Sequence, residues 1–160
     1  KVIRFPEDKV RTMGRQARGV RGIKLADENK VISLVIVAEN SPILTATEKG
    51  YGKRTSIEDY RITGRGGQGV ISIQVNERNG KVIGALQAAN DGEIFLISNK
   101  GTLVRTKVDE ISLVGRNTQG VRLIRLANSE DLISMQALID SDDGDEQDSC
   151  ESEEKEVGVE

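Results

Sequence analysis

The chain has no histidine, no tryptophan and a single cysteine among its 160 residues. Without histidine there is no imidazole base and no His-containing zinc site. Cys150 can form neither an intrachain disulfide nor a CxxC pair, and its acidic neighbours disfavour the thiolate, so we expect no nucleophilic role for it. A single cysteine is consistent with a reducing, cytoplasmic environment.

Aromatic residues and long apolar runs are also scarce. Two tyrosines and two phenylalanines cannot build the stacking platform that single-strand binders use. No apolar run approaches the ~20 residues of a membrane span, and no signal peptide opens the chain. The chain begins with Lys1 inside a strand-like pattern, so we expect it to be a piece of a longer polypeptide.

Charge is distributed unevenly along the chain. Residues 1–139 contain 22 basic and 15 acidic side chains, whereas residues 140–160 contain 11 acidic side chains and one basic. A basic body of this kind points to a polyanionic partner. We expect 140–160 to form an acidic, disordered tail, because it has too few apolar residues to fold. Its carboxylates resemble a calcium loop only poorly, so we expect no metal site.

A short motif recurs three times and divides the body into units of about 50 residues. It occupies Gly14–Val20, Gly64–Val70 and Gly115–Val121, and each copy begins Gly-Arg and ends Gly-Val. We call these the first, second and third Gly-Arg boxes. Arg4, Arg54 and Arg105 each stand ten residues before a box. A triple match at one period indicates repeated supersecondary units.

Short apolar runs between turn dipeptides predict an all-β fold with four strands per unit. The predicted strands are 20–25, 31–37, 43–47 and 51–57 in one unit, then 70–75, 82–89, 94–97 and 102–108 in the next. Residues 132–139 are compatible with either a strand or a helix. The runs 31–37 and 94–97 are nearly continuous in apolar residues, which predicts burial on both faces. Radially packed four-stranded blades satisfy this pattern.

The boxes resemble those of the C-terminal domain of DNA gyrase A and of its topoisomerase IV homologue. Gly50–Thr55, Gly69–Ile73, Gly101–Thr106 and Val114–Val121 are most similar to gyrase, and the resemblance covers 1–139. It implies a β-pinwheel, a propeller-like disc whose blades exchange strands, here an incomplete ring. It also implies a non-catalytic domain that bends duplex DNA around a basic rim.

In the intact enzyme, the resemblance implies that this wrap supports ATP-dependent negative supercoiling in an A2B2 assembly of gyrase A and gyrase B. ATP and Mg²⁺ would act elsewhere in that assembly, in the bacterial cytoplasm at the nucleoid. The family's Gln-Arg-Arg-Gly-Gly-Lys-Gly box has no copy in this chain, and we expect it upstream of Lys1. Two alternatives remain: the topoisomerase IV domain, and a propeller-like scaffold that binds an acidic protein.

The predicted DNA contacts are basic residues at the boxes, at the hairpin tips and on the following strands. Glycine lets the backbone approach a phosphate closely, and arginine can donate two hydrogen bonds to it. The predicted set is Arg15, Arg18, Lys49, Lys53, Arg54, Arg65, Lys100, Arg105, Lys107 and Arg116. Without a recognition helix, we expect sequence-tolerant contacts to the duplex backbone.

Several other conspicuous residues are better explained by structure than by catalysis, metal binding or DNA contact. Adjacent carboxylates such as Asp27-Glu28 and Glu58-Asp59 point apart in extended chain, so one metal is hard to share. Arg122 and Arg125 are three apart and face opposite sides of a strand, so we rank them below the box arginines. Tyr51 and Tyr60 lack the neighbours of a nucleophilic tyrosine and are assigned to packing or to the surface. We therefore expect no catalytic residue in this chain.

Overall fold

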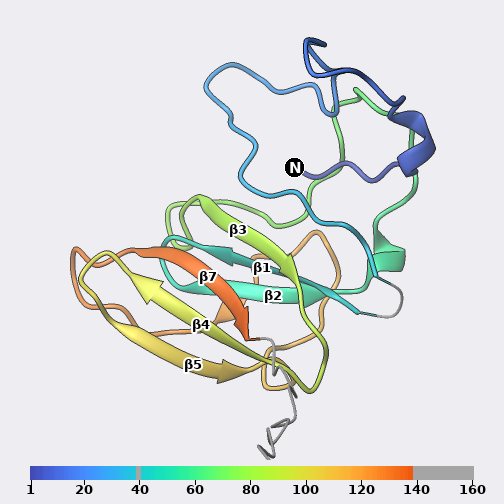
Figure 1. Cartoon of the computed structure of the whole chain (residues 1–160). Helices are drawn as coiled ribbons and strands as arrows, with labels where there is room; N and C mark the ends of the chain where they lie inside the picture. Colours follow the sequence, from blue (N-terminus) through green and yellow to red (C-terminus); the bar gives the residue numbers. More distant parts are fainter. Residues whose placement is uncertain (39–40, 139–160) are drawn as a thin grey trace, which may run out of the picture.

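The computed structural model describes residues 1–38 and 41–138, and within them it is built almost entirely from β-strands and turns (Figure 1). Two short 3-10 turns, η1 (Glu7–Lys9) and η2 (Ile57–Asp59), accompany seven strands. The strands are β1 (Ile43–Thr47), β2 (Tyr51–Thr55), β3 (Val82–Gln87), β4 (Glu93–Ser98), β5 (Leu103–Lys107), β6 (Val121–Arg122) and β7 (Leu132–Leu138). The predicted all-β class is confirmed, and 132–138 is a strand.

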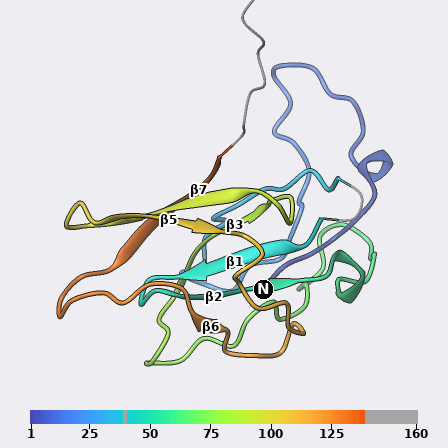
Figure 2. The same ribbon diagram turned by 90° about the horizontal axis from the view of Figure 1, so that it is seen from below.

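The strands form two antiparallel sheets that pack against each other (Figures 1 and 2). One sheet has the order β3-β1-β2-β6 and the other β5-β4-β7. Apolar side chains between the sheets form the core, including Leu44 from β1, Leu96 from β4 and Leu132 from β7, each at most 1% exposed. Burial of such side chains supplies the main driving force for stacking the two sheets.

The two sheets are successive copies of one unit. β4, β5 and β7 follow β1, β2 and β3 by about 50 residues, and they pair in the same order. The fourth strand of the larger sheet, β6, comes from the third Gly-Arg box and pairs Val121 with Gly52. The larger sheet therefore takes a strand from the unit that follows it, as the resemblance to a β-pinwheel implied.

Three predicted strands, 20–25, 31–37 and 70–75, are not formed. Val70 makes an isolated bridge with Val2, and residues 20–25 and 31–37 contain no assigned strand. Burial of 31–37 on both faces was also wrong, because Leu34 and Ile36 are each 90% exposed. Residues 31–37 lie 51 residues before β3 and so occupy the equivalent place in the preceding unit. β3 pairs with β1, but no described strand pairs with the backbone of 31–37. An apolar run becomes a strand only where a neighbouring strand accepts its hydrogen bonds.

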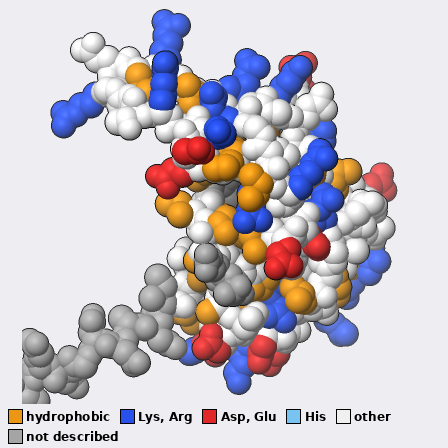
Figure 3. Space-filling model, turned by 90° about the vertical axis from the view of Figure 1, so that its right-hand side faces the viewer, with side chains coloured by type: hydrophobic (Ala, Val, Ile, Leu, Met, Phe, Trp, Pro, Cys, Tyr) orange, Lys and Arg blue, Asp and Glu red, His pale blue; other side chains and the backbone are white. Residues whose placement is uncertain are grey.

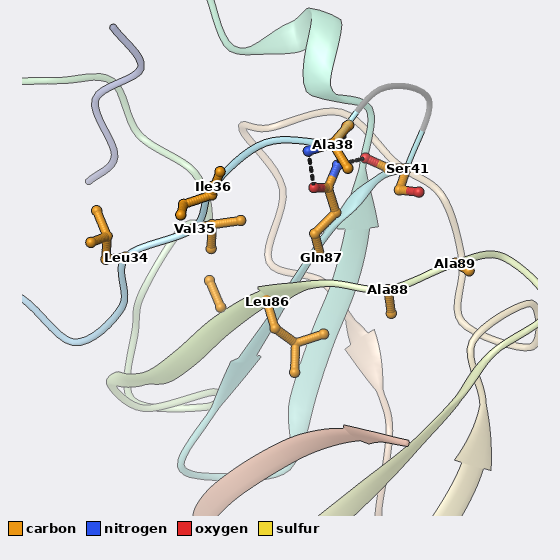
Figure 4. Close-up of a pocket in the computed structure, with 10 residues that line it drawn as sticks. Leu34, Val35, Ile36, Ala38, Ser41, Leu86, Gln87, Ala88 and Ala89 are labelled. Carbon is orange, nitrogen blue, oxygen red and sulfur yellow. Dashed lines mark hydrogen bonds between the residues drawn. The ribbon is translucent and has the colours of Figure 1, made fainter. Parts of the chain in front are cut away.

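Residues 31–38 nevertheless lie beside β3, where side chains hold them (Figure 4). The side-chain oxygen of Gln87 accepts from the Ala38 amide at 2.7 Å, and its side-chain nitrogen donates to the Ala38 carbonyl at 2.8 Å. Further along, the Ala85 amide donates to the Ser33 hydroxyl at 2.9 Å. These contacts leave a shallow groove between the segment and β3 that Leu34, Ile36 and Leu86 line.

Candidate nucleic-acid interface

Backbone contacts between successive units recur at the same positions in each unit. Val2 and Val70 exchange hydrogen bonds of 2.9 and 2.8 Å, and one unit later Gly52 pairs with Val121. The Lys24 amide donates to the Gly67 carbonyl at 2.8 Å, and the Gln74 amide donates to the Thr118 carbonyl at 2.9 Å. The boxes therefore join each unit to the preceding one, and their first structural role is to connect blades.

The box arginines take part in this connection. An Nη of Arg65 donates to the Arg21 carbonyl at 2.7 Å, and an Nη of Arg116 donates to the Ile71 carbonyl at 3.0 Å. Arg21 and Ile71 stand at equivalent places in their units. Both guanidinium groups are thus anchored to the preceding unit and only partly exposed, while Arg15 is exposed. Contact of Arg65 and Arg116 with phosphate stays a prediction, and it would involve side chains that are already hydrogen-bonded to the preceding unit.

Arg54 is more fully committed to the protein. Its guanidinium donates to the carbonyls of Ile111 at 2.6 Å and Asp109 at 3.1 Å, and to the side-chain oxygen of Asn90 at 2.9 Å. Arg4 repeats this arrangement one unit earlier by donating to the Ile57 carbonyl at 2.9 Å. In both units, the arginine ten residues before a box therefore links its segment of chain to a turn of the next unit.

Lys53 has no exposed surface for a phosphate. It is 0% exposed, and its ammonium donates to the carbonyls of Gly115 and Arg116 and to the Thr118 hydroxyl. The pKa of Lys53 is lowered to about 8, chiefly by burial; the carboxylate of Asp59 opposes this shift and the nearby charge of Arg116 adds to it. We withdraw Lys53 from the predicted DNA contacts, because its buried amino group donates its hydrogen bonds to the third box.

The hairpin-tip lysines and the β5 arginine are exposed but have local partners. Lys49 forms an ion pair with Asp131 at 2.6 Å, and Arg105 forms one with Glu93. Lys100 donates to the Ser129 hydroxyl at 2.9 Å and to the Asn128 carbonyl at 3.2 Å. Exposed pairs of this kind contribute little stability, so a phosphate can compete with them. All three remain candidate contacts.

Arg15, Arg18 and Lys107 are the predicted residues whose charge is least engaged. All three are exposed, and none donates a side-chain hydrogen bond to another residue within 1–38 or 41–138. In Figure 3, Lys and Arg side chains lie along the upper and right-hand margin of the face, where few acidic side chains interrupt them. Such a margin offers a path for a polyanion.

Sequence reasoning missed a basic cluster around Tyr51. Arg78, in the turn before β3, and Arg122, on β6, both donate to the Tyr51 hydroxyl, at 3.2 and 2.8 Å. Tyr51 itself is 5% exposed, so of the two assignments left open, packing or surface, the structure favours packing. The cluster does not repeat between units, and Arg78 and Tyr51 are 27 residues apart in sequence. Only the pairing of β2 with β6, a non-local contact, brings Arg122 to this place.

Two further observations bound the chemistry of the described chain. Residues 1–38 and 41–138 contain no group of three or more His, Cys, Asp or Glu side chains placed to hold a metal ion. No helix in the same ranges is long and apolar enough to cross a membrane. The acidic segment 140–160, including Cys150 and the poor calcium-loop match, lies outside the described residues.

A family model described as "DNA gyrase C-terminal domain, beta-propeller" matches the chain three times, over residues 1–38, 41–89 and 92–138. The chain belongs to this family. The three matches coincide with the three repeated units, so the propeller-like fold that the resemblance implied is confirmed.

Curated relatives agree with this assignment. The chain is 54% identical over 151 residues to the DNA gyrase A protein of Salmonella typhimurium, and 53% identical over 154 residues to that of Pseudomonas aeruginosa. These alignments cover 94% and 96% of the chain but only 17% of either relative. The chain therefore spans about one sixth of the length of the relatives that it matches.

Solved structures show the same fold. The structure of a DNA gyrase A C-terminal domain superposes with a TM-score of 0.78 at 30% identity, covering 84% of this chain and 46% of that one. The C-terminal domain of DNA topoisomerase IV superposes equally well, with a TM-score of 0.78, at 24% identity. The second likeness concerns the fold alone.

Proposed function

We propose that this chain is a non-catalytic, duplex-DNA-binding part of DNA gyrase A that bends DNA along its basic margin. In the assembled enzyme, this wrap would support ATP-dependent negative supercoiling, with gyrase B, ATP and Mg²⁺ acting elsewhere in an A2B2 assembly. The gyrase A relatives, about half identical to this chain, favour gyrase over topoisomerase IV.

The observation that carries this proposal is the surplus of unpaired positive charge. All 22 basic residues of 1–139 lie in the described ranges, but only Lys9, Lys49 and Arg105 lie within ion-pair distance of a described carboxylate. A surface with this excess repels itself and attracts a polyanion over about a Debye length. The surplus is consistent with contact to phosphates rather than with internal neutralisation.

Rigid attachment of the boxes supports bending in particular. The repeated backbone bonds and the anchored guanidinium groups of Arg65 and Arg116 fix the spacing between basic groups on successive blades. Bending a 20–30 base-pair site costs on the order of 1–6 kcal/mol, which a rigid array of contacts can offset. A flexible array would follow straight DNA instead.

Duplex binding by the 160-residue chain tests the proposal. We expect it to bind duplexes of unrelated sequence with similar affinity, because phosphate contacts carry no sequence information. The logarithm of the binding constant should fall with the logarithm of salt concentration, by about 0.9 for each phosphate neutralised. Fluorescence anisotropy over a salt series measures both quantities.

The charge-neutralising pair Arg15→Gln and Arg18→Gln should weaken binding for all sequences alike and flatten the salt dependence. A scaffold for an acidic protein does not require duplex affinity. Absence of duplex binding at low salt would contradict the proposal, and so would a strong preference for one sequence.

A further inference from the structure

Three side chains from separate elements meet at the free edge of the larger sheet. Tyr51 begins β2, Arg122 ends β6 directly opposite it in the strand pairing, and Arg78 lies in the turn that leads to β3. The guanidinium carbons of Arg78 and Arg122 lie 5.0 and 5.3 Å from the centre of the Tyr51 ring. Both cations therefore rest on one aromatic ring, a contact that stabilises a guanidinium group but does not neutralise it.

This cluster contains more hydrogen-bond donors than its own acceptors can satisfy. The Tyr51 oxygen accepts from Nε of Arg78 at 3.2 Å and from an Nη of Arg122 at 2.8 Å, which uses both lone pairs. Within 1–38 and 41–138, neither the phenol proton nor the other N–H groups of the two guanidinium groups have a side-chain or carbonyl acceptor. The two arginines also lower the Tyr51 pKa through these bonds, Arg122 more than Arg78.

No described carboxylate lies within ion-pair distance of either guanidinium group. The ion pairs of the described residues involve Lys9, Lys49 and Arg105, and none of them involves Arg78 or Arg122. Two guanidinium groups held over one ring repel each other, and an anion placed between them relieves that repulsion. The cluster thus has the donors and the charge of an anion site but contains no anionic side chain.

The cluster is also held in position before any ligand arrives. The Asn76 side chain accepts from the amides of Arg78 and Asn79, at 3.0 and 3.2 Å, and closes the turn that carries Arg78. Asn79 is 1% exposed, and its side-chain nitrogen donates to the carbonyls of Gln74 and Gln119, at 2.6 and 3.2 Å. The turn is thereby tied to the third box, and a preformed site loses less entropy when it binds.

We propose that Arg78, Tyr51 and Arg122 form a phosphate-binding site, and that it takes one phosphodiester group of the DNA backbone. The assignment to DNA rests on the proposed function; the phosphate chemistry does not. The two exposed guanidinium groups supply charged N–H donors in a fork that matches phosphate oxygens. The phenol of the buried Tyr51 adds an O–H donor from the floor of the site.

DNA binding tests the site in the 160-residue chain. The double variant Arg78→Gln with Arg122→Gln should flatten the log–log salt dependence by about 0.9, the value for one lost phosphate. The matched control is Arg61→Gln with Arg125→Gln, which removes the same charge from two exposed arginines that have no described side-chain hydrogen bond. Circular dichroism and thermal melting establish that both variants are folded. Equal slopes in the two double variants would overturn the DNA assignment.

Inorganic phosphate tests the site without DNA. In a Tyr60→Phe background, ultraviolet absorbance follows the ionisation of Tyr51 alone, because the chain has two tyrosines. Phosphate bound beside the phenol disfavours the phenolate, so it should raise the Tyr51 pKa relative to chloride at equal ionic strength. The effect should vanish when Arg78→Gln and Arg122→Gln are added.

The two experiments separate the site from the proposed function. No phosphate effect on Tyr51 would overturn the phosphate site, even if the chain binds DNA through other residues. A phosphate effect in a chain that fails to bind duplex would support the site and contradict the proposed function. A phosphate effect with unchanged DNA slopes would limit the site to free phosphate and overturn its assignment to DNA.

Discussion

The ammonium group of Lys53 is enclosed by the third Gly-Arg box. In the neighbouring units the equivalent positions hold Ile3 and Val104, which are apolar. A buried ammonium loses hydration, and here two carbonyls and a hydroxyl replace part of it. Lys53 therefore connects two units by a charge-assisted contact that the other units do not make.

Replacement of Lys53 by Met should lower the free energy of unfolding by about 1–3 kcal/mol, because buried carbonyls lose their donor. It should also change the pH dependence. The pKa of Lys53 is about 8 in the folded chain against 10.5 when unperturbed. Between these values the unfolded chain binds more protons, so this group makes the native state more stable as pH rises.

Urea unfolding at about pH 7 and about pH 10 measures both effects. The rise in stability that Lys53 contributes should be absent from Lys53→Met. Lys107→Met is the control, since Lys107 is exposed and lacks a described side-chain partner. An unchanged pH dependence in Lys53→Met would contradict the assigned environment.

At the scale of elements, the strands of the two hairpins, β1 with β2 and β4 with β5, were predictable, and so was β3, although it pairs with β1 across a long connection. The turn dipeptides Asn79-Gly80 and Asp91-Gly92 located β3 and β4, and the apolar runs gave β1, β2 and β5 to within a few residues. The segment 31–37 has the same composition but failed as a strand, because pairing depends on a neighbour that its own sequence does not specify.

The site was harder to predict for the same reason. The recurrence of the box arginines predicts contact with phosphate, but a repeated residue can also serve the repeat itself, as the bonds from Arg65 and Arg116 to the preceding units show. The Tyr51 cluster gave no signal in the sequence, since strand exchange brings Arg122 to Tyr51. Non-local pairing thus decided two outcomes that the sequence did not predict: the absence of a strand at 31–37 and the cluster around Tyr51.

In the second and third boxes, the glycine before the final valine permits close approach of two units. Gly120 has φ 78°, and a Cβ there would lie 2.7 Å from the Gly52 carbonyl oxygen. Gly69 is in the same conformation against Val2 one unit earlier. Gly101 also has positive φ, at 86°, but no atom lies within 4 Å of a Cβ built on it.

Gly120→Ala should therefore cost more than Gly101→Ala. Both variants place alanine in the left-handed region, at about 1–2 kcal/mol, and the clash in Gly120→Ala should raise its cost to about 3–4 kcal/mol. Thermal or urea unfolding of the two variants measures the difference. Equal costs would show that backbone conformation alone requires glycine at the end of a box.

At the scale of the whole molecule, the repeated arginines before the boxes hold the blades in sequence. Arg4 and Arg54 each donate to carbonyls in the turn that follows the second strand of the next unit, and the backbone of each forms a bridge with the segment leading to the next box. Arg105 occupies the equivalent place on β5, where its described partner is Glu93 in the adjacent strand. One sequence position thus exists in two environments within one chain.

The different environments of Arg54 and Arg105 allow one repeated position to be compared within the same chain. Arg54→Gln removes donors to the carbonyls of Ile111 and Asp109 and to Asn90, and it should lower the free energy of unfolding by about 2–4 kcal/mol. Arg105→Gln breaks an exposed ion pair and should cost about 0–1 kcal/mol. Both variants remove one positive charge, so long-range electrostatics cannot account for a gap between them. Urea unfolding of the pair measures it; equal costs would mean that the arginines before the boxes do not hold the blades together.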